Sequence, residues 1–106
     1  MVLTNLPDAA SAEQLAGELL AQRLAACVNI LAPVRSLYRW QGKIETAAEV
    51  PLLIKTVAAR YDALEAAIKA RHPYEVPEII ALPISAGLPA YLAWVAAETE
   101  ATGCPC

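Results

Sequence analysis

Residues 71–80, with the sequence RHPYEVPEII, combine several side chains that can act in metal binding or proton transfer. This stretch holds the only histidine of the chain, His72, together with Tyr74, Glu75 and Glu78. Imidazole, phenol and carboxylate groups supply the donors and acceptors that both kinds of chemistry need. The two prolines in the stretch also predict a stiff connection from a helix to a strand, so the stretch can be a site or a structural corner.

The same side chains have structural interpretations. Pro73 disfavours helical geometry at the preceding residue, which places His72 at a helix C-terminus, where a lone histidine commonly bonds backbone carbonyl groups. Glu75 and Glu78 lie three positions apart, and in an extended chain this spacing directs them to opposite faces. They are therefore not predicted to form an acid/base pair.

The chain contains three cysteines, Cys27, Cys104 and Cys106. Their number and placement do not suit a disulfide framework. The absence of such a framework fits a reducing compartment. Cys27 lies in an apolar stretch and is predicted to be a small buried hydrophobe. Cys104 and Cys106 stand in the terminal sequence GCPC, where two thiolates can share a soft metal ion. A frayed tail over about residues 99–106 is the simpler interpretation.

Sequences typical of catalytic sites are absent. The chain has no G-x-S-x-G, C-x-x-C, H-E-x-x-H, G-x-G-x-x-G or P-loop sequence. A nucleophile pair of Cys27 and His72 is disfavoured, because Cys27 has no basic neighbour in the sequence that would favour its thiolate. We therefore predict that the protein is not an enzyme.

Length and charge restrict the organisation of the chain and its partners. At 106 residues it is predicted to be a single domain, residues 1–106. The formal net charge of −3 argues against a nucleic-acid partner, since such binding depends on clustered Lys and Arg side chains. No apolar run reaches the roughly 18 residues that suggest a membrane span, and the first residues lack the basic-then-apolar order of a signal peptide. These patterns predict a cytoplasmic protein with no membrane partner.

The hydrophobic content predicts self-association. Hydrophobic residues make up 58% of the chain, whereas about 45–50% is typical of soluble domains. A single domain of this size cannot bury all of these side chains, so apolar surface is expected to remain for contacts between subunits.

The hydrophobic periodicity predicts an α+β fold with the element order βαββαβα. Strands are expected at residues 2–6, 27–40, 43–57 and 78–85. Helices are expected from a cap at Asp8 or Ser11 to about Ala25, from about Tyr61 to His72, and after Gly87. This order is that of a ferredoxin-like βαββαβ sandwich with a C-terminal helix, in which both crossover helices cover one face of the sheet.

A long β-hairpin, residues 27–57, is the largest of the predicted elements. Pro33 is expected to kink its first strand, and Gln41-Gly42 is expected to form its turn because glycine adopts positive φ without steric cost. Pro51 removes one ladder hydrogen bond, so the return strand is expected to be bulged or to lie at a sheet edge there. The hairpin is longer than a small sheet requires, and we expect it to pair with other subunits and cover the free face of the sheet.

Five segments of the sequence occur in an order and at a spacing that are highly specific. They are residues 24–30 (LAACVNI), 36–44 (SLYRWQGKI), 52–56 (LLIKT), 72–79 (HPYEVPEI) and 91–94 (YLAW). In these segments the chain resembles the CutA divalent-ion tolerance family, over about residues 2–98. The resemblance implies a ferredoxin-like subunit related in fold to PII signalling proteins and assembled as a homotrimer through the long hairpin. It also implies a role in tolerance of copper and other divalent metals, with no established catalytic reaction.

The resemblance also bears on metal ligands. Family members with a described copper site use a cysteine on the first strand and a histidine pair just before Pro-Tyr, and the matching positions here are Thr4 and Arg71-His72. One imidazole cannot hold copper tightly, since soft cations favour several thiolate or imidazole ligands. Copper or another divalent cation is therefore expected to be weakly held, and the candidate ligands are His72, Cys104 and Cys106.

Two functions are compatible with these observations. The first is a trimeric, cytoplasmic, non-enzymatic protein of metal-ion response, whose cleft between subunits is lined by His72, Tyr74, Glu75 and Glu78. The alternative is a PII-like small-molecule sensor, or an enzyme, that uses the same cleft.

In the alternative, Trp40 stacks on a ligand and Lys55 binds an anionic group of it. Tyr38 and Trp40 fall on one strand face and can line such a pocket, although alternating aromatic residues are also common in cores and subunit contacts.

Overall fold

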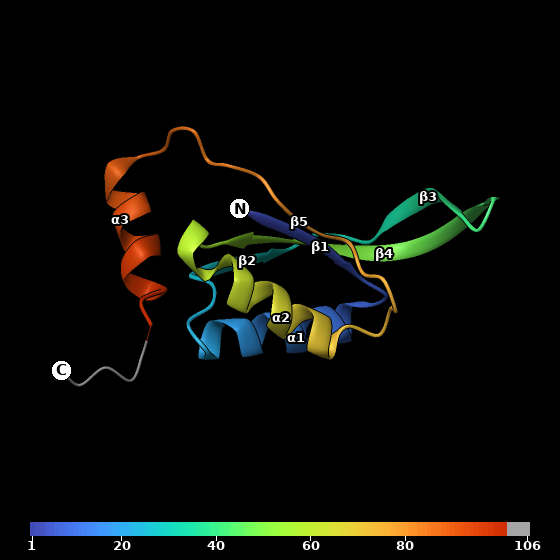
Figure 1. Ribbon diagram of the computed structural model, residues 1–106, viewed down its shortest axis with the longest axis horizontal. Helices are drawn as coiled ribbons and strands as arrows, with labels where there is room; N and C mark the ends of the chain where they lie inside the picture. The colour runs from blue at the N-terminus through green and yellow to red at the C-terminus, as the bar shows by residue number, and fades with distance from the viewer. Residues whose placement is uncertain (102–106) are drawn as a thin grey trace.

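A computed structural model of the chain describes residues 1–101 and has the predicted α+β architecture, with one strand divided in two (Figure 1). The elements in order are β1 (Val2–Leu6), α1 (Ala9–Ala21), β2 (Cys27–Ile30), β3 (Val34–Trp40), β4 (Lys43–Lys55), a 3₁₀ turn (Ala58–Arg60), α2 (Tyr61–Arg71), β5 (Ile79–Ala81) and α3 (Pro89–Glu98). No helix within residues 1–101 combines the length and the apolar character needed to cross a membrane.

The strands form one antiparallel sheet in the order β2-β4-β1-β5, and β3 extends it by pairing with the outer part of β4. The central strand β1 pairs on both sides, with Thr4 opposite Leu52 of β4 and Ile79 of β5. This is the strand order of the predicted ferredoxin-like sandwich. The sheet positions the end of β1, the hairpin and the segment after α2 next to one another (Figure 1).

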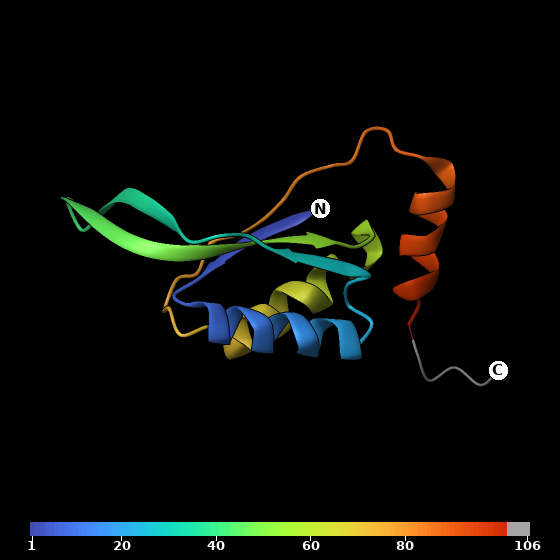
Figure 2. The same cartoon turned by 180° about the vertical axis from the view of Figure 1, so that it is seen from behind.

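Helices α1 and α2 lie on one face of the sheet and enclose the core (Figures 1 and 2). Alternate residues of β4 point toward these helices, namely Val50, Leu52 and Ile54, each at most 3% exposed. The helices contribute leucine and isoleucine side chains one turn apart, among them Leu15 and Leu19 of α1 and Leu64 and Ile68 of α2. An ion pair between Arg71 and Glu18 joins the two helices at the surface.

Helix α1 is capped by the first of the two predicted residues. The Asp8 carboxylate accepts a hydrogen bond of 2.7 Å from the backbone N–H of Ser11. The expected end near Ala25 is wrong, because the helix ends at Ala21. Arg23 has a positive φ of 57°, and the N–H groups of Arg23 and Leu24 bond the carbonyls of Leu20 and Leu19 in a Schellman motif. Leu24 is thus buried in the core just after the helix, and not as part of it.

The predicted strand 27–40 is broken at residues 31–33, so that β2 and β3 pair with different parts of β4. Of the two expectations at Pro51, the sheet edge is wrong, because β4 is central and pairs with β1 through Pro51 itself. The pairing is irregular there, as the bulge would require, but the extra residue lies in residues 31–33 and not in β4. The Pro51 carbonyl accepts a hydrogen bond of 3.0 Å from Leu31 N–H. In an antiparallel sheet the N and O atoms of one residue point toward the same neighbouring strand. The nitrogen of Pro51, which has no hydrogen to donate, therefore faces the break at residues 31–33 and not β1.

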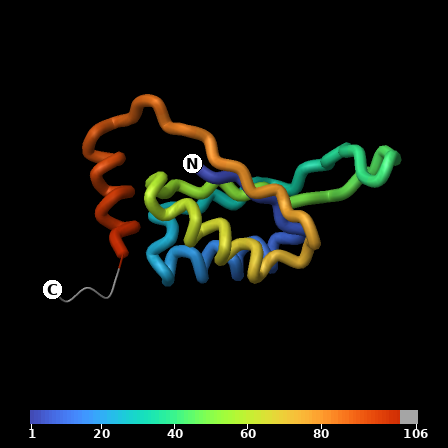
Figure 3. Tube along the Cα trace, in the orientation of Figure 1, coloured from blue at the N-terminus to red at the C-terminus, as the bar shows by residue number. Residues whose placement is uncertain are grey.

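The predicted strand 78–85 is also shorter than expected. Pairing ends at Leu82, whose N–H donates to the Met1 carbonyl at 2.7 Å, and Pro83 follows with no N–H to continue the ladder. Residues 82–88 then cross to α3 as an extended segment without regular structure (Figure 3).

Helix α3 stands at the end of the molecule opposite the hairpin tip (Figures 1 and 3). The Arg23 guanidinium donates to the carbonyls of Ala97 (2.8 Å) and Glu100 (3.2 Å) near the end of this helix. Thr99 is 1% exposed and its hydroxyl donates to the Val95 carbonyl at 2.8 Å, so the chain is anchored at residue 99, where we had expected a tail to begin. Residues 102–106 of that tail, including Cys104 and Cys106, lie outside the described residues.

The second face of the sheet carries no helix within residues 1–101 (Figure 2). Large apolar side chains are exposed on the hairpin, on residues 82–88 and on α3. They include Leu37 (64%), Ile44 (72%), Ile84 (46%), Leu88 (71%) and Trp94 (44%). A monomer would leave this apolar surface in contact with water.

Candidate functional site

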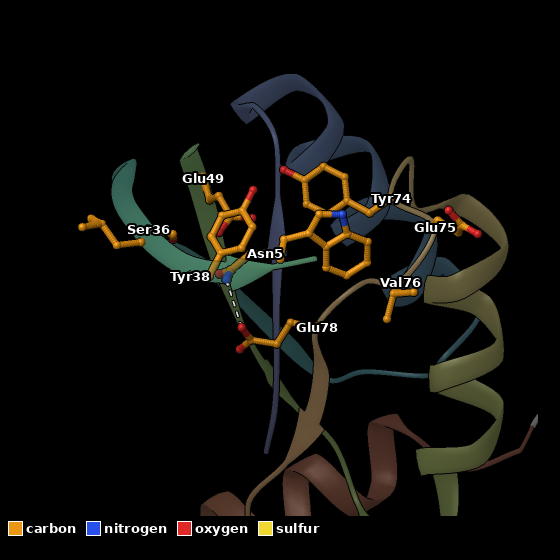
Figure 4. A pocket seen from close by; sticks show the side chains of 10 residues that line it. Asn5, Ser36, Tyr38, Glu49, Tyr74, Glu75, Val76 and Glu78 are labelled. Atoms are coloured by element: carbon orange, nitrogen blue, oxygen red, sulfur yellow. Dashed lines mark hydrogen bonds between the residues drawn. The ribbon is translucent and has the colours of Figure 1, made fainter. Parts of the chain in front are cut away.

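A cavity lies where the hairpin meets the segment after α2 (Figure 4). Its volume is about 600 Å³, which is within the range of small-molecule sites. It is lined by Asn5 of β1, by Ser36, Leu37, Tyr38 and Trp40 of β3, by Glu49 of β4, and by Tyr74, Glu75, Val76 and Glu78. Segments that are distant in the sequence therefore form one site.

The alternation of strand residues accounts for the hairpin side of the cavity. Ser36, Tyr38 and Trp40 are spaced by two and lie on one face of β3. Val34 of β3 lies directly opposite Glu49 of β4, which puts the glutamate on that same face. This face is turned away from α1 and α2, because the intervening residue Val50 points into the core.

The corner after α2 is held by hydrogen bonds to β1. Helix α2 ends at Arg71 with His72 as its C-cap, as predicted from Pro73. Nε2 of His72 lies 2.6 Å from the Asn5 carbonyl oxygen, and the Tyr74 N–H donates to Nδ1 of His72 at 3.1 Å. Because Nδ1 accepts, Nε2 must carry the proton and donate it to Asn5. Both ring nitrogens are therefore engaged within the chain.

The other end of the corner is also attached to Asn5, whose side-chain amide donates to Glu78 at 3.4 Å (Figure 4). The Glu75 carboxylate points away from that of Glu78 in this view, as the sequence spacing had indicated. The rings of His72 and Tyr74 pack with centroids 4.8 Å apart. The corner thus forms a wall of the cavity that hydrogen bonds attach to β1, with Tyr74 and Glu78 on it.

The cavity is acidic. Its lining within residues 1–101 includes three glutamates and no lysine or arginine. Glu49 is only 9% exposed, and it has no ion-pair partner in the described part of the chain. Burial, followed by the charge of the nearby Glu49 carboxylate and a hydrogen bond to it, raises the pKa of Tyr74 above its usual value.

Lys55, which we had expected to bind an anion in the cleft, does not line this cavity. It is the last residue of β4 and pairs with Cys27 of β2, at the end of the strand away from the hairpin tip. The expectation placed Lys55 in one cleft with Trp40. The structure separates them, because β4 runs on past the hairpin into the centre of the sheet.

No group of three or more His, Cys, Asp or Glu side chains within residues 1–101 is arranged to hold a metal ion. His72 is 8% exposed and has no free ring nitrogen, so in this conformation it cannot coordinate a metal ion. Thr4, at the position that matches the family cysteine, is fully buried under the helices. A metal site at these two positions is thus not supported by the geometry of the single chain.

Glu49 is the lining residue that sequence reasoning missed. The alternation of side chains along β4 could have indicated it, because Glu49 lies two positions before Pro51, on the face of the strand that does not point into the core. We had weighed Tyr38 as a pocket residue only together with Trp40, and both line the cavity.

The sequence model of the CutA1 divalent ion tolerance protein matches residues 1–98. The chain belongs to this family. It is 46% identical over 98 residues to the divalent-cation tolerance protein CutA of Pectobacterium atrosepticum, covering 92% of this chain and 89% of that protein. It is also 44% identical to the chloroplastic protein CutA 1 of Oryza sativa subsp. japonica, covering 94% of this chain but only 56% of the length of that protein.

The fold is that of solved CutA1 structures. The divalent cation tolerance protein (Cut A1) from Thermus thermophilus superposes with a TM-score of 0.91 at 44% sequence identity, covering 93% of this chain and 96% of that one. This agreement confirms the predicted family and the α+β fold class.

Proposed function

We propose that the protein serves in tolerance of divalent cations, copper among them, as a non-enzymatic homotrimer in the cytoplasm. The observation that carries the proposal is the family match over residues 1–98, with relatives named as divalent-cation tolerance proteins. The absence of catalytic sequence signatures favours a binding or regulatory role over catalysis.

The exposed apolar surface supports self-association. Leu37 and Ile44 on the hairpin and Leu88 before α3 are each more than 60% exposed, and the face of the sheet opposite α1 and α2 carries no helix within the described chain. A trimer that buries the hairpin and this face would remove these side chains from water.

Copper binding, as we propose it, does not use one chain's His72 alone, because both of its ring nitrogens are bonded. The two thiols of Cys104 and Cys106, which lie outside the described residues, are the remaining candidate ligands from the sequence. Two soft ligands from each of three subunits would suit Cu(I).

The test of the function is growth of a bacterium that lacks its own CutA1-family protein, with and without this chain, over a series of copper and zinc concentrations. We expect the chain to raise the copper concentration that halves the growth rate. A stoichiometric metal assay and light scattering on the purified reduced protein would accompany it. Unchanged growth with both metals, from a chain that is expressed and folded, would count against the proposal.

The cavity favours a second candidate function, a PII-like small-molecule sensor. A cavity of about 600 Å³ with aromatic and carboxylate walls has the size and the kind of lining that are typical of small-molecule sites. The sensor would respond to a ligand through Tyr74 and Glu78. Glu78 is bonded directly to Asn5 of β1, and Tyr74 is linked to Asn5 through His72.

A further inference from the structure

We propose that the cavity between β3 and the corner after α2 binds a small organic ammonium ion. The inference rests on the second candidate function, the small-molecule sensor, and identifies the class of its ligand. It is carried by the charge of the cavity, the burial of Glu49 and the aromatic walls.

The charge of the lining indicates the sign of the charge that a ligand would carry. Glu49 is 9% exposed and has no ion-pair partner among residues 1–101; the group beside it is the neutral phenol of Tyr74. Within the same residues, Glu78 is bonded to the neutral amide of Asn5 and to no cationic side chain. A buried carboxylate without a cationic partner is costly, and a ligand with a positive charge would relieve that cost. An anionic ligand would meet like charges and no lysine or arginine in the lining of the described chain.

The aromatic walls favour an organic cation. Tyr38 and Trp40 come from one face of β3, and Tyr74 comes from the corner. Aromatic rings attract cations through their π faces, and cages of such rings recognise alkylated ammonium groups. Trp40 and Tyr38 line the cavity and are each more than 40% exposed in the single chain, so other residues of that chain do not cover their rings completely.

A bare divalent metal ion fits the cavity less well. Metal ions of this class need several donor atoms that converge at about 2 Å, and no such group of side chains exists within residues 1–101. Glu75 and Glu78 also point apart (Figure 4). A volume of about 600 Å³ suits a molecule of several heavy atoms better than a single ion.

The test is calorimetric titration of the full chain, in its solution assembly, with choline as the probe. The neutral isostere 3,3-dimethyl-1-butanol and the anion acetate are titrated in parallel. The variants are Glu49→Gln and Trp40→Leu. Glu45→Gln is the matched control, since Glu45 lies in the same strand, opposite Tyr38, and does not line the cavity. Circular dichroism and light scattering establish that each variant is folded and has the wild-type mass.

We expect saturable binding of choline that weakens about tenfold in Glu49→Gln and in Trp40→Leu, and that is unchanged in Glu45→Gln. The isostere should bind about tenfold more weakly than choline, because it lacks only the charge. Fluorescence of Trp40, observed in a Trp94→Phe background, should change with choline and follow the same affinity.

Equal affinity for choline and its isostere would overturn the proposal, as would equal losses in Glu45→Gln and Glu49→Gln. If the isostere or acetate binds and choline does not, the charge inference fails while the sensor function stands. If none of the three binds, both fail, and the metal function is judged by the growth test alone. A change of oligomer mass in Glu49→Gln with no ligand binding would mean that another copy of the chain supplies the cation.

Discussion

The imidazole of His72 and the backbone of Asn5 are joined by a hydrogen bond of 2.6 Å between Nε2 and the Asn5 carbonyl oxygen. Since the Asn5 side chain also bonds Glu78, one residue of β1 holds both ends of the corner. The corner in turn forms one wall of the cavity, with Tyr74 between its two attachments. His72 is thus a structural residue that positions the wall, and not an open ligand.

His72→Ala should lower the free energy of unfolding by about 1–3 kcal/mol, because it leaves the Asn5 carbonyl and the Tyr74 N–H without their partner. The measurement is urea unfolding at fixed protein concentration, with and without EDTA. Lys69→Ala, an exposed change on the same helix, is the control and should have an effect of at most about 0.5 kcal/mol. A loss of stability that appears only when divalent metal is present would instead make His72 a ligand.

Much of the fold followed from the sequence, because its signals are local. Leu64 and Ile68 recur at helical spacing, Pro73 ends α2, and Gly42 marks the hairpin turn, and each of these predictions is confirmed. The errors arose where a distant partner decides the structure. Leu24 continues the helical pattern of α1 but is buried after a Schellman motif, and Pro51 is tolerated in a central strand because β2 and β3 separate beside it.

The site could be predicted only in part for the same reason. Tyr74, Glu75 and Glu78 were recognised because they cluster in ten residues of sequence, and Trp40 because of its strand alternation. Glu49 enters the cavity through its pairing with Val34, a register that depends on the whole hairpin. The bond from His72 to Asn5 spans 67 positions in the chain, and no local pattern indicates it.

Gly42→Val should weaken assembly more than it disturbs the subunit core. Gly42 has a φ of 79° and follows Gln41 with a φ of 50°, as in a type I′ turn, and a β-branched residue there costs roughly 1–3 kcal/mol. The turn lies beyond the helices, so the strain falls on the hairpin that we propose to join the subunits (Figure 1). Light scattering should show a lower mass. The matched control is Gly17→Ala in α1, where the added methyl group meets open space, and it should keep the wild-type mass. An unchanged mass and melting temperature in Gly42→Val would contradict the prediction.

The Asp8 cap should make stability depend on pH at the acidic end. Hydrogen bonds from the backbone and side chain of Ser11 lower the pKa of Asp8 below its usual 3.8, so folding favours the charged carboxylate. A carboxylate whose pKa is lower in the folded than in the unfolded protein stabilises the fold at pH values above its unfolded-state pKa. That contribution is lost as the pH falls through the folded-state pKa. The difference in unfolding free energy between wild type and Asp8→Ala should therefore be largest near about pH 7 and shrink below about pH 4. A difference that stays constant down to about pH 2 would show that the charge plays no part.

Copper should bind through the two terminal cysteines and not through His72. Cys104 and Cys106 offer two soft ligands, whereas His72 is 8% exposed with both nitrogens bonded, so coordination there would first break a bond to Asn5 or Tyr74. Competition against a chelator in reducing buffer should show that changing both terminal cysteines to serine removes most Cu(I) binding while the mass of the assembly is kept. Cys27→Ser, which removes the remaining thiol from the edge of β2, is the control for loss of a cysteine as such and should keep the affinity. His72→Ala should also keep the Cu(I) affinity. The opposite result, in which His72→Ala abolishes Cu(I) binding and the double serine variant does not, would contradict the prediction. It would mean that the corner opens to coordinate copper and that the family ligand position is used in this chain.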